Sequence, residues 1–600
     1  MAAPFAHPEH EPVARAAAGF ARTHADLVAL RPEPLHLLAR TRHAGRRTGL
    51  VSGGGAGHEP LHVGLLGPGL LDGAAPGMVF TSPHNRQVLE AGRAAAGPDG
   101  VVLVVKNYTG DVINFRIAAE RLRLEGVRVG EVLVDDDVAT DSADNAAGRR
   151  GTAATVVVEK LLGAAADAGA DVDALVDLGT RVVAASRSLA VASRAQTDPA
   201  TGEPAFALGP HELELGVGIH GERAERTVAR PPLPELVEQL VGQVLAALPA
   251  EPGEASGAAG DGVLVVVNGL GATTQLELYA VMEEVTEALD RRGVAVAGAL
   301  VGTYVAALDM HGFSVTLTAL EEGWLDLWRA PSSSAALSGG GPGGPEVVPA
   351  PWSGAGGEPP AAAAPVDGAA PADGSLPQGA SAPERALRRW AGDVEASHDD
   401  LTRLDRLAGD GDFGDNVRGG LRRVVARLDA DGPASGRTGA EALAAAGEVF
   451  LDEVGGPGGP LVGLLLAELA AAAERAGGET SAGDAAWSEG LRDGVAAVQR
   501  VGGAQVGDRT LVDALDPAVR ALGDGGSLAD AAAAAADRAA ATAQVRARRG
   551  RAAYLGDRVV GTPDPGAVAM AMLLRAAVVT GDEADDPSAS AVEELLAAGR

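Results

Sequence analysis

The chain has 600 residues with a formal charge of −32 at pH 7, and 46% of its residues are hydrophobic, enough for several cores. It is too long for one ordinary domain, and its acidity argues against general binding of nucleic acid, whose phosphates would be repelled. With no apolar run long enough for a membrane span, no secretory signal and no cysteine, we expect a cytoplasmic protein without a membrane partner.

The first half alternates strand and helix patterns. Short valine-rich runs at 100–105, 129–134 and 262–267 each end in a polar or glycine loop. Such runs predict buried strands in α/β layers, with ligands at the C-terminal ends of the strands. We predict two α/β subdomains, 1–190 and 191–330.

A glycine run at 53–55 follows a strand predicted over 48–52 and leads to His58. Such a run lets backbone N–H groups approach a small polar ligand or a phosphate, although the Lys-Ser/Thr ending of a P-loop is missing. His58 could serve as an acid or base. A structural turn with a capping histidine explains the segment equally well.

The strand at 100–105 runs into Lys106-Asn-Tyr-Thr-Gly-Asp111. The chain has only two lysines, Lys106 and Lys160, and its other cations are arginines. Lys106 therefore marks a position that needs a compact ammonium group, unless its identity is chance. Asp111 could take a proton from a hydroxyl, or could cap a helix that begins near Val112.

A third segment, 216–222, places His220 between small residues. An imidazole there is accessible and can bond covalently to an electrophilic carbon such as a ketone carbonyl. The alternative is an ordinary loop histidine.

Residues 331–382 are dominated by Ser, Gly, Pro and Ala, a composition that predicts a long disordered linker. Beyond it, residues 383–600 show alanine-rich helical patterns interrupted by Gly-Pro loops, with almost no strand signal. We predict an all-α domain there.

Three aspartates, Asp405, Asp410 and Asp412, lie within eight residues of a glycine-broken loop in this helical half. Carboxylates this close repel one another unless a cation lies among them, and hard oxygen ligands suit Mg²⁺ or Ca²⁺. The spacing does not fit an EF-hand loop. The pattern indicates a metal–nucleotide site or, alternatively, a solvated acidic turn.

Taken together, these segments resemble the dihydroxyacetone kinases in their single-chain, ATP-dependent form. The matching stretches are Ser-Gly-Gly-Gly-Ala-Gly-His-Glu-Pro, Lys-Asn-Tyr-Thr-Gly-Asp and Gly-Val-Gly-Ile-His-Gly-Glu in the first half, and Gly-Asp-Gly-Asp, Gly-Asp-Arg-Thr-Leu-Val-Asp-Ala-Leu and Gly-Arg-Ala-Ala-Tyr-Leu-Gly-Asp-Arg in the second. The resemblance covers nearly all of the chain except the linker. It implies an α/β K half of two subdomains that binds substrate, followed by an all-α, helical-barrel L half that binds the nucleotide.

In that family a histidine holds the ketose covalently as a hemiaminal, and His220 matches it. His58 and Asp111 match the residues that hydrogen-bond the substrate hydroxyl and assist its attack on the γ-phosphate. Gly55 and Lys106 match substrate-contacting positions.

The resemblance also implies ligands for the nucleotide. Asp405, Asp410 and Asp412 match the ligands of two Mg²⁺ ions that bridge its phosphates. The matching nucleotide-binding positions are Asn416, Gly458, Gly502, Leu511, Arg551, Asp564 and Gly566. The glycine loop at 455–460 departs from the family, because Pro457 removes a backbone donor and a hydroxyl expected at position 458 is missing, so the phosphate contact is weakened.

The resemblance implies ATP-dependent phosphorylation of dihydroxyacetone, or of a close short-chain ketose or triose, with ATP and two Mg²⁺ ions as cofactors and a homodimer formed through the K half. Three alternatives remain open: a phosphotransferase-system-dependent kinase that keeps ADP bound, a ketose sensor without catalysis, and cyclisation of FAD as a side activity.

Overall fold

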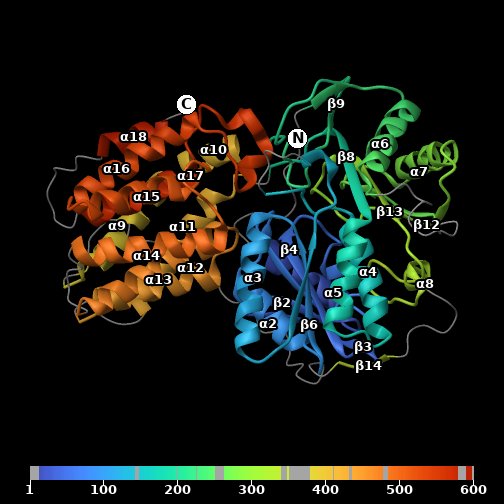
Figure 1. Cartoon of the computed structure of the whole chain (residues 1–600), viewed down its shortest axis with the longest axis horizontal. Coiled ribbons are helices and arrows are strands. Elements are labelled where there is room, and N and C mark those ends of the chain that lie inside the picture. Colours follow the sequence, from blue (N-terminus) through green and yellow to red (C-terminus); the bar gives the residue numbers. More distant parts are fainter. Residues whose placement is uncertain are drawn as a thin grey trace. The chain divides into compact units, whose positions relative to one another are not determined.

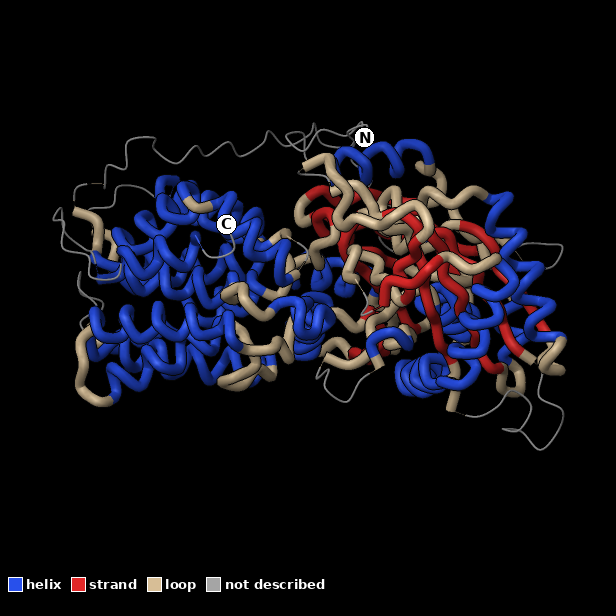
Figure 2. Tube along the Cα trace, turned by 90° about the horizontal axis from the view of Figure 1, so that it is seen from above, coloured by secondary structure: helices blue, strands red, loops and turns tan. Residues whose placement is uncertain are grey.

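The computed structural model divides the chain into two compact units, Met1–Ala361 and Ala362–Arg600 (Figures 1 and 2). It describes residues 12–141, 147–198, 201–223, 226–249, 262–339, 347–350, 377, 379–409, 411–430, 436–477, 484–578 and 589–597. The first unit is α/β and the second is helical, which confirms the predicted fold class. Within the described ranges, no helix combines the length and apolarity needed to cross a membrane.

Two six-stranded sheets form the first unit, drawn red in Figure 2. The first has the order β1-β2-β5-β4-β6-β7. Its strands are β1 (Val28–Pro32), β2 (Leu35–Ala39), β5 (Gly73–Val79), β4 (Thr48–Ala56), β6 (Gly100–Lys106) and β7 (Val129–Val134). The last four pair in parallel, so the C-terminal ends of β4 and β6 lie side by side at one edge.

Helices cover both faces of this sheet (Figure 1). They are α2 (Asn85–Ala95) and α3 (Thr109–Leu124) on one face, α4 (Ala154–Asp167) and α5 (Val172–Ala184) on the other. Alternate residues of β6, such as Val101 and Leu103, pack in the core under α2 and α3. On the opposite face, Gly130 of β7 lies against Val172 and Val176 of α5. Both faces of the sheet are buried, as its valine runs predict.

The second sheet has the order β10-β9-β8-β13-β11-β12, and only β11 and β12 pair in parallel. Its strands are β10 (Arg226–Ala229), β9 (Glu212–Leu215), β8 (Ser186–Arg194), β13 (His311–Ala319), β11 (Val263–Gly269) and β12 (Val296–Gly302). Helices α6 (Leu233–Ala247) and α7 (Gln275–Asp290) pack on one face through a leucine- and valine-rich core. The predicted subdomain boundary at 190 falls inside β8, a strand of this second sheet.

Shorter elements complete the first unit: helices α1 (Pro12–Thr23) and α8 (Trp324–Arg329), strands β3 (Thr41–His43) and β14 (Val347–Pro349), and 3₁₀ turns at Val63–Leu65 and Val138–Thr140.

Part of the segment predicted as linker belongs to the first unit. Strand β14 pairs with β3, with Val347 opposite His43. Upstream, Ala336 N donates to Gly64 O at 2.9 Å. The linker composition gave no sign of these segments, because they are held by backbone hydrogen bonds, which any residue with an N–H can make. Residues 351–376 of the predicted linker lie outside the described part.

The second unit consists of helices. They are α9 (Ala382–Ala396), α10 (His398–Ala408), α11 (Phe413–Ala430), α12 (Gly439–Glu453), α13 (Gly458–Arg475), α14 (Asp484–Gly502), α15 (Leu511–Gly523), α16 (Leu528–Ala541), α17 (Pro565–Val578) and α18 (Ala589–Ala597), with 3₁₀ turns at Thr542–Gln544 and Arg551–Val559. Each helix from α11 to α17 contacts the next, α17 contacts α9, and α9 contacts α11. These contacts close a ring of helices around one core.

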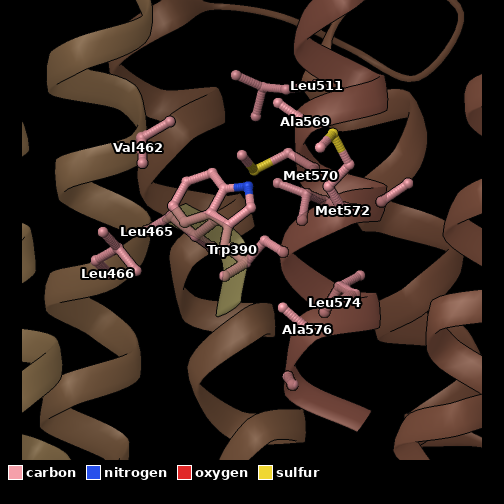
Figure 3. Packing of buried hydrophobic residues seen from close by; sticks show 14 of the residues in the cluster. Trp390, Val462, Leu465, Leu466, Leu511, Ala569, Met570, Met572, Leu574 and Ala576 are labelled. Carbon is pink, nitrogen blue, oxygen red and sulfur yellow. The ribbon is translucent and has the colours of Figure 1, made fainter. Parts of the chain in front are cut away.

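Trp390 of α9 lies at the centre of that core (Figure 3). Its fully buried indole stacks on the ring of Phe450, with centroids 5.8 Å apart. Leu465 of α13 and Met570 of α17 pack around it. One side chain therefore joins helices that are far apart in sequence.

We expect Trp390→Ala to lower the free energy of unfolding of the helical unit by about 3–5 kcal/mol, because it opens a large cavity. Chemical denaturation followed by far-UV circular dichroism measures this. Leu407→Ala, at a side chain that is 44% exposed, serves as the control and should cost less than about 1 kcal/mol. An equal loss in both variants would contradict the central role of Trp390.

Candidate active site

Two histidines from different sheets meet inside the first unit. His58 follows β4 and His220 follows β9, and their Nε2 atoms lie 3.1 Å apart. Both side chains are buried. The sequence gives no hint of this contact, because the two residues are 162 positions apart.

Fixed partners orient both rings. His58 Nδ1 donates to the carbonyl oxygen of Ala306 at 2.8 Å, and His220 Nδ1 donates to Glu222 Oε1 at 2.9 Å. Each Nε2 atom therefore turns toward the other ring. Because two lone pairs would repel at this distance, one proton lies between the two Nε2 atoms.

Charge is balanced behind His220. Glu222 accepts the backbone N–H of His220 at 3.0 Å through Oε2, which lies 3.9 Å from the buried guanidinium of Arg150. Burial opposes ionisation, but His220 and Arg150 together hold the pKa of Glu222 well below its ordinary value. The carboxylate thus stays charged and keeps Nδ1 of His220 protonated. For His58, burial and the charges of His220 and Lys106 lower the pKa well below the ordinary value.

A loop of the second sheet holds His58 in place. Asn268, at the end of β11, accepts the N–H groups of Tyr304 and Val305 at 2.9 and 2.8 Å. These bonds present the Ala306 carbonyl to His58. Sequence analysis missed Asn268, although it stands in the polar loop that ends a valine run.

Aromatic rings enclose the histidine pair. The ring centroids of Tyr108 and Phe80 lie 4.6 and 5.3 Å from that of His220, both edge-on. Phe80 also stacks on His58 at 5.2 Å. The enclosure shields the two Nε2 atoms from bulk water, and it favours a small ligand.

Asp111 reaches the same region from the first turn of α3. The helix begins at Thr109 with Tyr108 at its N-cap, so the expectation that Asp111 caps a helix from Val112 is wrong. Its Oδ2 lies 3.8 Å from Lys106 Nζ, and its buried Oδ1 faces no hydrogen-bond donor among the described residues. A buried carboxylate oxygen without a donor suits a ligand hydroxyl.

The glycine run lies within β4 rather than after it, since the strand continues to Ala56 paired with β5. Close approach explains the glycines. A Cβ on Gly55 would lie 2.6 Å from the backbone of Phe80, and a Cβ on Gly54 would lie 2.2 Å from Lys106 Nζ. Side chains here would close the space in front of Lys106.

The other lysine is structural. Lys160 Nζ donates to the carbonyl oxygens of Leu327 and Ala330 at the end of α8. Burial lowers the pKa of Lys160 to about 8. Of the two lysines, only Lys106 lies beside the histidine pair.

In the second unit, the nucleotide-binding positions predicted from the sequence lie mainly where helices begin or end. Alternate helices of a ring run in the same direction, so α11, α13, α15 and α17 start at one end. Asn416, Gly458, Leu511 and Gly566 lie in the first turns of these four helices, and Gly502 ends α14. Four converging N-termini favour an anion such as phosphate.

Close contacts link these positions. The Cβ position of Gly458 lies 3.5 Å from the ring of Phe413, and that of Gly566 lies 3.6 Å from Leu511 Cβ. Asp564 Oδ2 accepts the N–H of Ala567 at 2.9 Å. The loop at 455–460 leads into α13 with Pro457 at the N-cap and no side-chain capping bond.

The acidic loop is described in part. Asp405 is buried at the end of α10 and accepts the N–H of Phe413 at 3.0 Å, and Asp412 Oδ2 lies 3.7 Å from Arg551 Nη1. Asp410 lies outside the described residues. Among those described, no three acidic or histidine side chains form a ready metal cluster.

Burial raises the pKa of Asp405, and it raises that of Asp564 to about 6 with a contribution from the Asp405 charge. A buried and a half-buried carboxyl group, both with hard oxygen donors, fit a divalent cation of the Mg²⁺ type.

Arg509 is a further residue that sequence analysis missed. Its buried guanidinium donates to Thr562 O at 2.8 Å and lies 4.0 Å from Asp564 Oδ1. Its backbone has a φ of 61°, which arginine rarely adopts. The sequence signal that could have marked Arg509 is its position in the Gly-Asp-Arg-Thr stretch, one of the segments that resemble the family.

Comparison with known proteins identifies the family. The Dak1 domain model matches residues 18–336, and the DAK2 domain model matches residues 407–579. The chain belongs to the dihydroxyacetone kinase family. As the resemblance predicted, the Dak1 and Dak2 domains stand in a single chain.

Relatives within this family match over most of their length. The chain is 36% identical to the L-erythrulose 1-kinase of Mycolicibacterium smegmatis over 541 residues, which cover 88% of this chain and 91% of the relative. It is 35% identical to human triokinase/FMN cyclase over 545 residues, which cover 88% and 91%. Among solved structures, the dihydroxyacetone kinase of C. freundii in complex with AMP-PNP and Mg²⁺ matches with a TM-score of 0.50 and 28% identity, covering 96% of this chain and 99% of that chain.

We expect Gly55→Ala to destabilise the first unit by about 1–3 kcal/mol, because the new methyl group overlaps the backbone of Phe80. Thermal unfolding of the full chain measures this. Gly19→Ala, in helix α1 where a Cβ meets nothing within 4 Å, is the matched control and should be neutral or stabilising by up to about 1 kcal/mol. Equal destabilisation of both variants would refute the close approach at Gly55.

Proposed function

We propose that the protein transfers the γ-phosphoryl group of ATP to a hydroxyl of dihydroxyacetone or a close short-chain ketose, with the substrate held on His220 as a covalent hemiaminal. The observation that carries this proposal is the buried His58–His220 pair, with Nε2 atoms 3.1 Å apart and their Nδ1 atoms both engaged. A carbonyl group inserted between the two Nε2 atoms meets a nucleophile on one side and a proton donor on the other.

The first step that we propose is the addition of His220 to the carbonyl group of the substrate. The lone pair of His220 Nε2 forms a bond to the carbonyl carbon, and the π electrons of the carbonyl move to its oxygen. That oxygen takes the proton shared by the two Nε2 atoms, which leaves His220 and reaches the oxygen through His58, so His58 is neutral before and after the step, as its lowered pKa favours. The Glu222 carboxylate stabilises the positive charge that the His220 ring acquires on bond formation.

The second step transfers the phosphoryl group. Asp111 takes the proton of the terminal hydroxyl through Oδ1, which faces no donor within the described part of the protein. The hydroxyl oxygen then attacks the γ-phosphorus, and ADP leaves with the electron pair of the broken P–O bond. The ammonium of Lys106, 3.8 Å from Asp111, stabilises the negative charge that develops on the attacking oxygen.

The second unit would hold the nucleotide. We assign Asp405, Asp410 and Asp412 as ligands of two Mg²⁺ ions, and the helix starts at Gly458 and Leu511 as part of the phosphate and nucleotide site. Bound Mg²⁺ neutralises the phosphates and polarises the γ-phosphoryl group. The match to a kinase structure that contains AMP-PNP and Mg²⁺ supports this assignment.

Several broader expectations remain part of the proposal: the K-domain subdomains 1–190 and 191–330, the L domain 383–600, a homodimer through the first unit and a cytoplasmic location. A second candidate activity, formation of a cyclic phosphate from a flavin nucleotide, is favoured by the likeness to triokinase/FMN cyclases. It would need only the metal–nucleotide unit, so incubation of the chain with FAD and a divalent cation tests it separately.

We expect the wild-type chain to phosphorylate dihydroxyacetone or erythrulose with ATP and Mg²⁺, and to leave glycerol untouched, because glycerol has no carbonyl carbon for His220. In His220→Ala, turnover of the ketose should fall by on the order of 10²-fold or more. A coupled ADP-release assay measures both. Equal turnover of glycerol and ketose would contradict the covalent anchor, and absence of ketose turnover in the wild type would favour a sensor or a different phosphodonor.

We expect Glu222→Gln to lower kcat/KM for the ketose by on the order of 10²-fold, because a neutral amide neither stabilises the charged ring nor keeps Nδ1 protonated. Glu214→Gln is the matched control, since Glu214 is also buried but pairs with Arg223. Loss of activity in both variants, or in neither, would argue against this role for Glu222.

A further inference from the structure

Two buried titratable groups, His62 and Glu159, lie behind Lys106 and take no part in the steps above. Lys106 Nζ lies 2.8 Å from His62 Nε2, and His62 Nδ1 lies 2.6 Å from Glu159 Oε1. Lys106, His62 and Glu159 are all buried, with at most 5% of each residue exposed. They come from the end of β6, the segment after β4 and the middle of α4, so only the tertiary fold joins them.

The directions of these hydrogen bonds fix which nitrogen of His62 carries the proton. A lysine ammonium only donates, so His62 Nε2 accepts, and His62 Nδ1 must then carry the proton that it donates to Glu159. Burial and the charges of Lys106 and His58 lower the pKa of His62 well below its ordinary value, which keeps this ring neutral. The neutral imidazole therefore connects a carboxylate to an ammonium group.

Lys106 and Glu159, at the two ends of this hydrogen-bonded series, influence each other's charge. Burial lowers the pKa of Lys106, while Asp111 and Glu159 oppose this change. Burial likewise raises the pKa of Glu159 to about 8, while Ser52 and Lys106 oppose it. Burial pushes each group toward its neutral form, and the charge of each group favours the charge of the other.

Glycine at position 54 leaves room for the contact between Lys106 and His62. A Cβ on Gly54 would lie 2.2 Å from Lys106 Nζ and 3.5 Å from His62 Nε2. The ammonium also lies 3.3 Å from the carbonyl oxygen of Gly53. The titratable or charged groups around Lys106 are His58, His62, Asp111 and Glu159.

We propose that Glu159 and His62 are positioning residues that keep Lys106 protonated and aimed at Asp111. Neither residue touches the site where the ketose is proposed to bind, and both act through the ammonium group. This inference deepens the proposed function, on which its kinetic consequence rests, but the charge of Lys106 can be measured without catalysis.

The two-lysine composition makes that measurement direct. Full-length protein labelled with ¹³C-lysine has only two lysine Cε signals, and Lys160→Arg assigns them. In the wild type we expect Lys106 to be an ammonium at pH 7. In Glu159→Gln the midpoint of its titration should move down by about one pH unit or more, because the compensating carboxylate is lost. Glu214→Gln removes a buried carboxylate that does not contact Lys106, His62 or Glu159. This variant should leave the midpoint of the Lys106 titration unchanged.

His62→Asn is the second variant, used if Glu159→Gln does not fold, and it too should lower the midpoint. A neutral Lys106 at pH 7 in the wild type would overturn the proposal, as would an unchanged midpoint in Glu159→Gln or, in its place, His62→Asn. In kinetics, the alkaline limb of kcat/KM should move to lower pH in Glu159→Gln, which a merely structural role does not predict. If the wild type turns over no ketose but the titration behaves as expected, the proposed function fails and the assignment of Glu159 and His62 stands.

Discussion

The hydrogen bond between His58 and the Ala306 carbonyl is the contact on which the rest of the candidate active site depends. It crosses from the first sheet to the second, at 2.8 Å, and the backbone N–H of Ala306 donates back to His58 O. Asn268 holds the loop that carries Ala306. Because this contact fixes one ring and Glu222 fixes the other, two imidazole nitrogens can be held face to face, an arrangement that a free chain would avoid.

Burial makes such an arrangement effective. The site collects His58, His220, Lys106 and Asp111 where water is largely excluded, so each charge depends on a specific partner rather than on solvent. Glu222 provides that partner for His220. Lys106 has such a partner as well, because Glu159 is connected to it through His62. The proposed ketose substrate offers few groups to bind, so the protein must supply charge at defined points.

In the helical unit, the candidate site is formed by the ends of helices. A ring of helices that alternate in direction brings four N-termini to one end without any need for a dedicated phosphate loop. Trp390 and Phe450 stack in the middle of the ring. The departure at Pro457 is tolerated structurally, since α13 still begins at Gly458.

The sequence alone determined the fold class, because hydrophobic periodicity is a local pattern. It also named His58, Asp111 and His220 as candidate site residues, which the structure brings to one region of the first unit. It also marked Lys106, through the near absence of other lysines. It could not show that the glycine run lies inside β4, that Asp111 is not a helix cap, or that residues 347–349 form a strand on β3, since each depends on a pairing partner elsewhere in the chain. The partners His62 and Glu159 likewise carry no local signal of their role. Only tertiary structure decided them, because a hydrogen bond joins atoms that are close in space, whatever their distance along the chain.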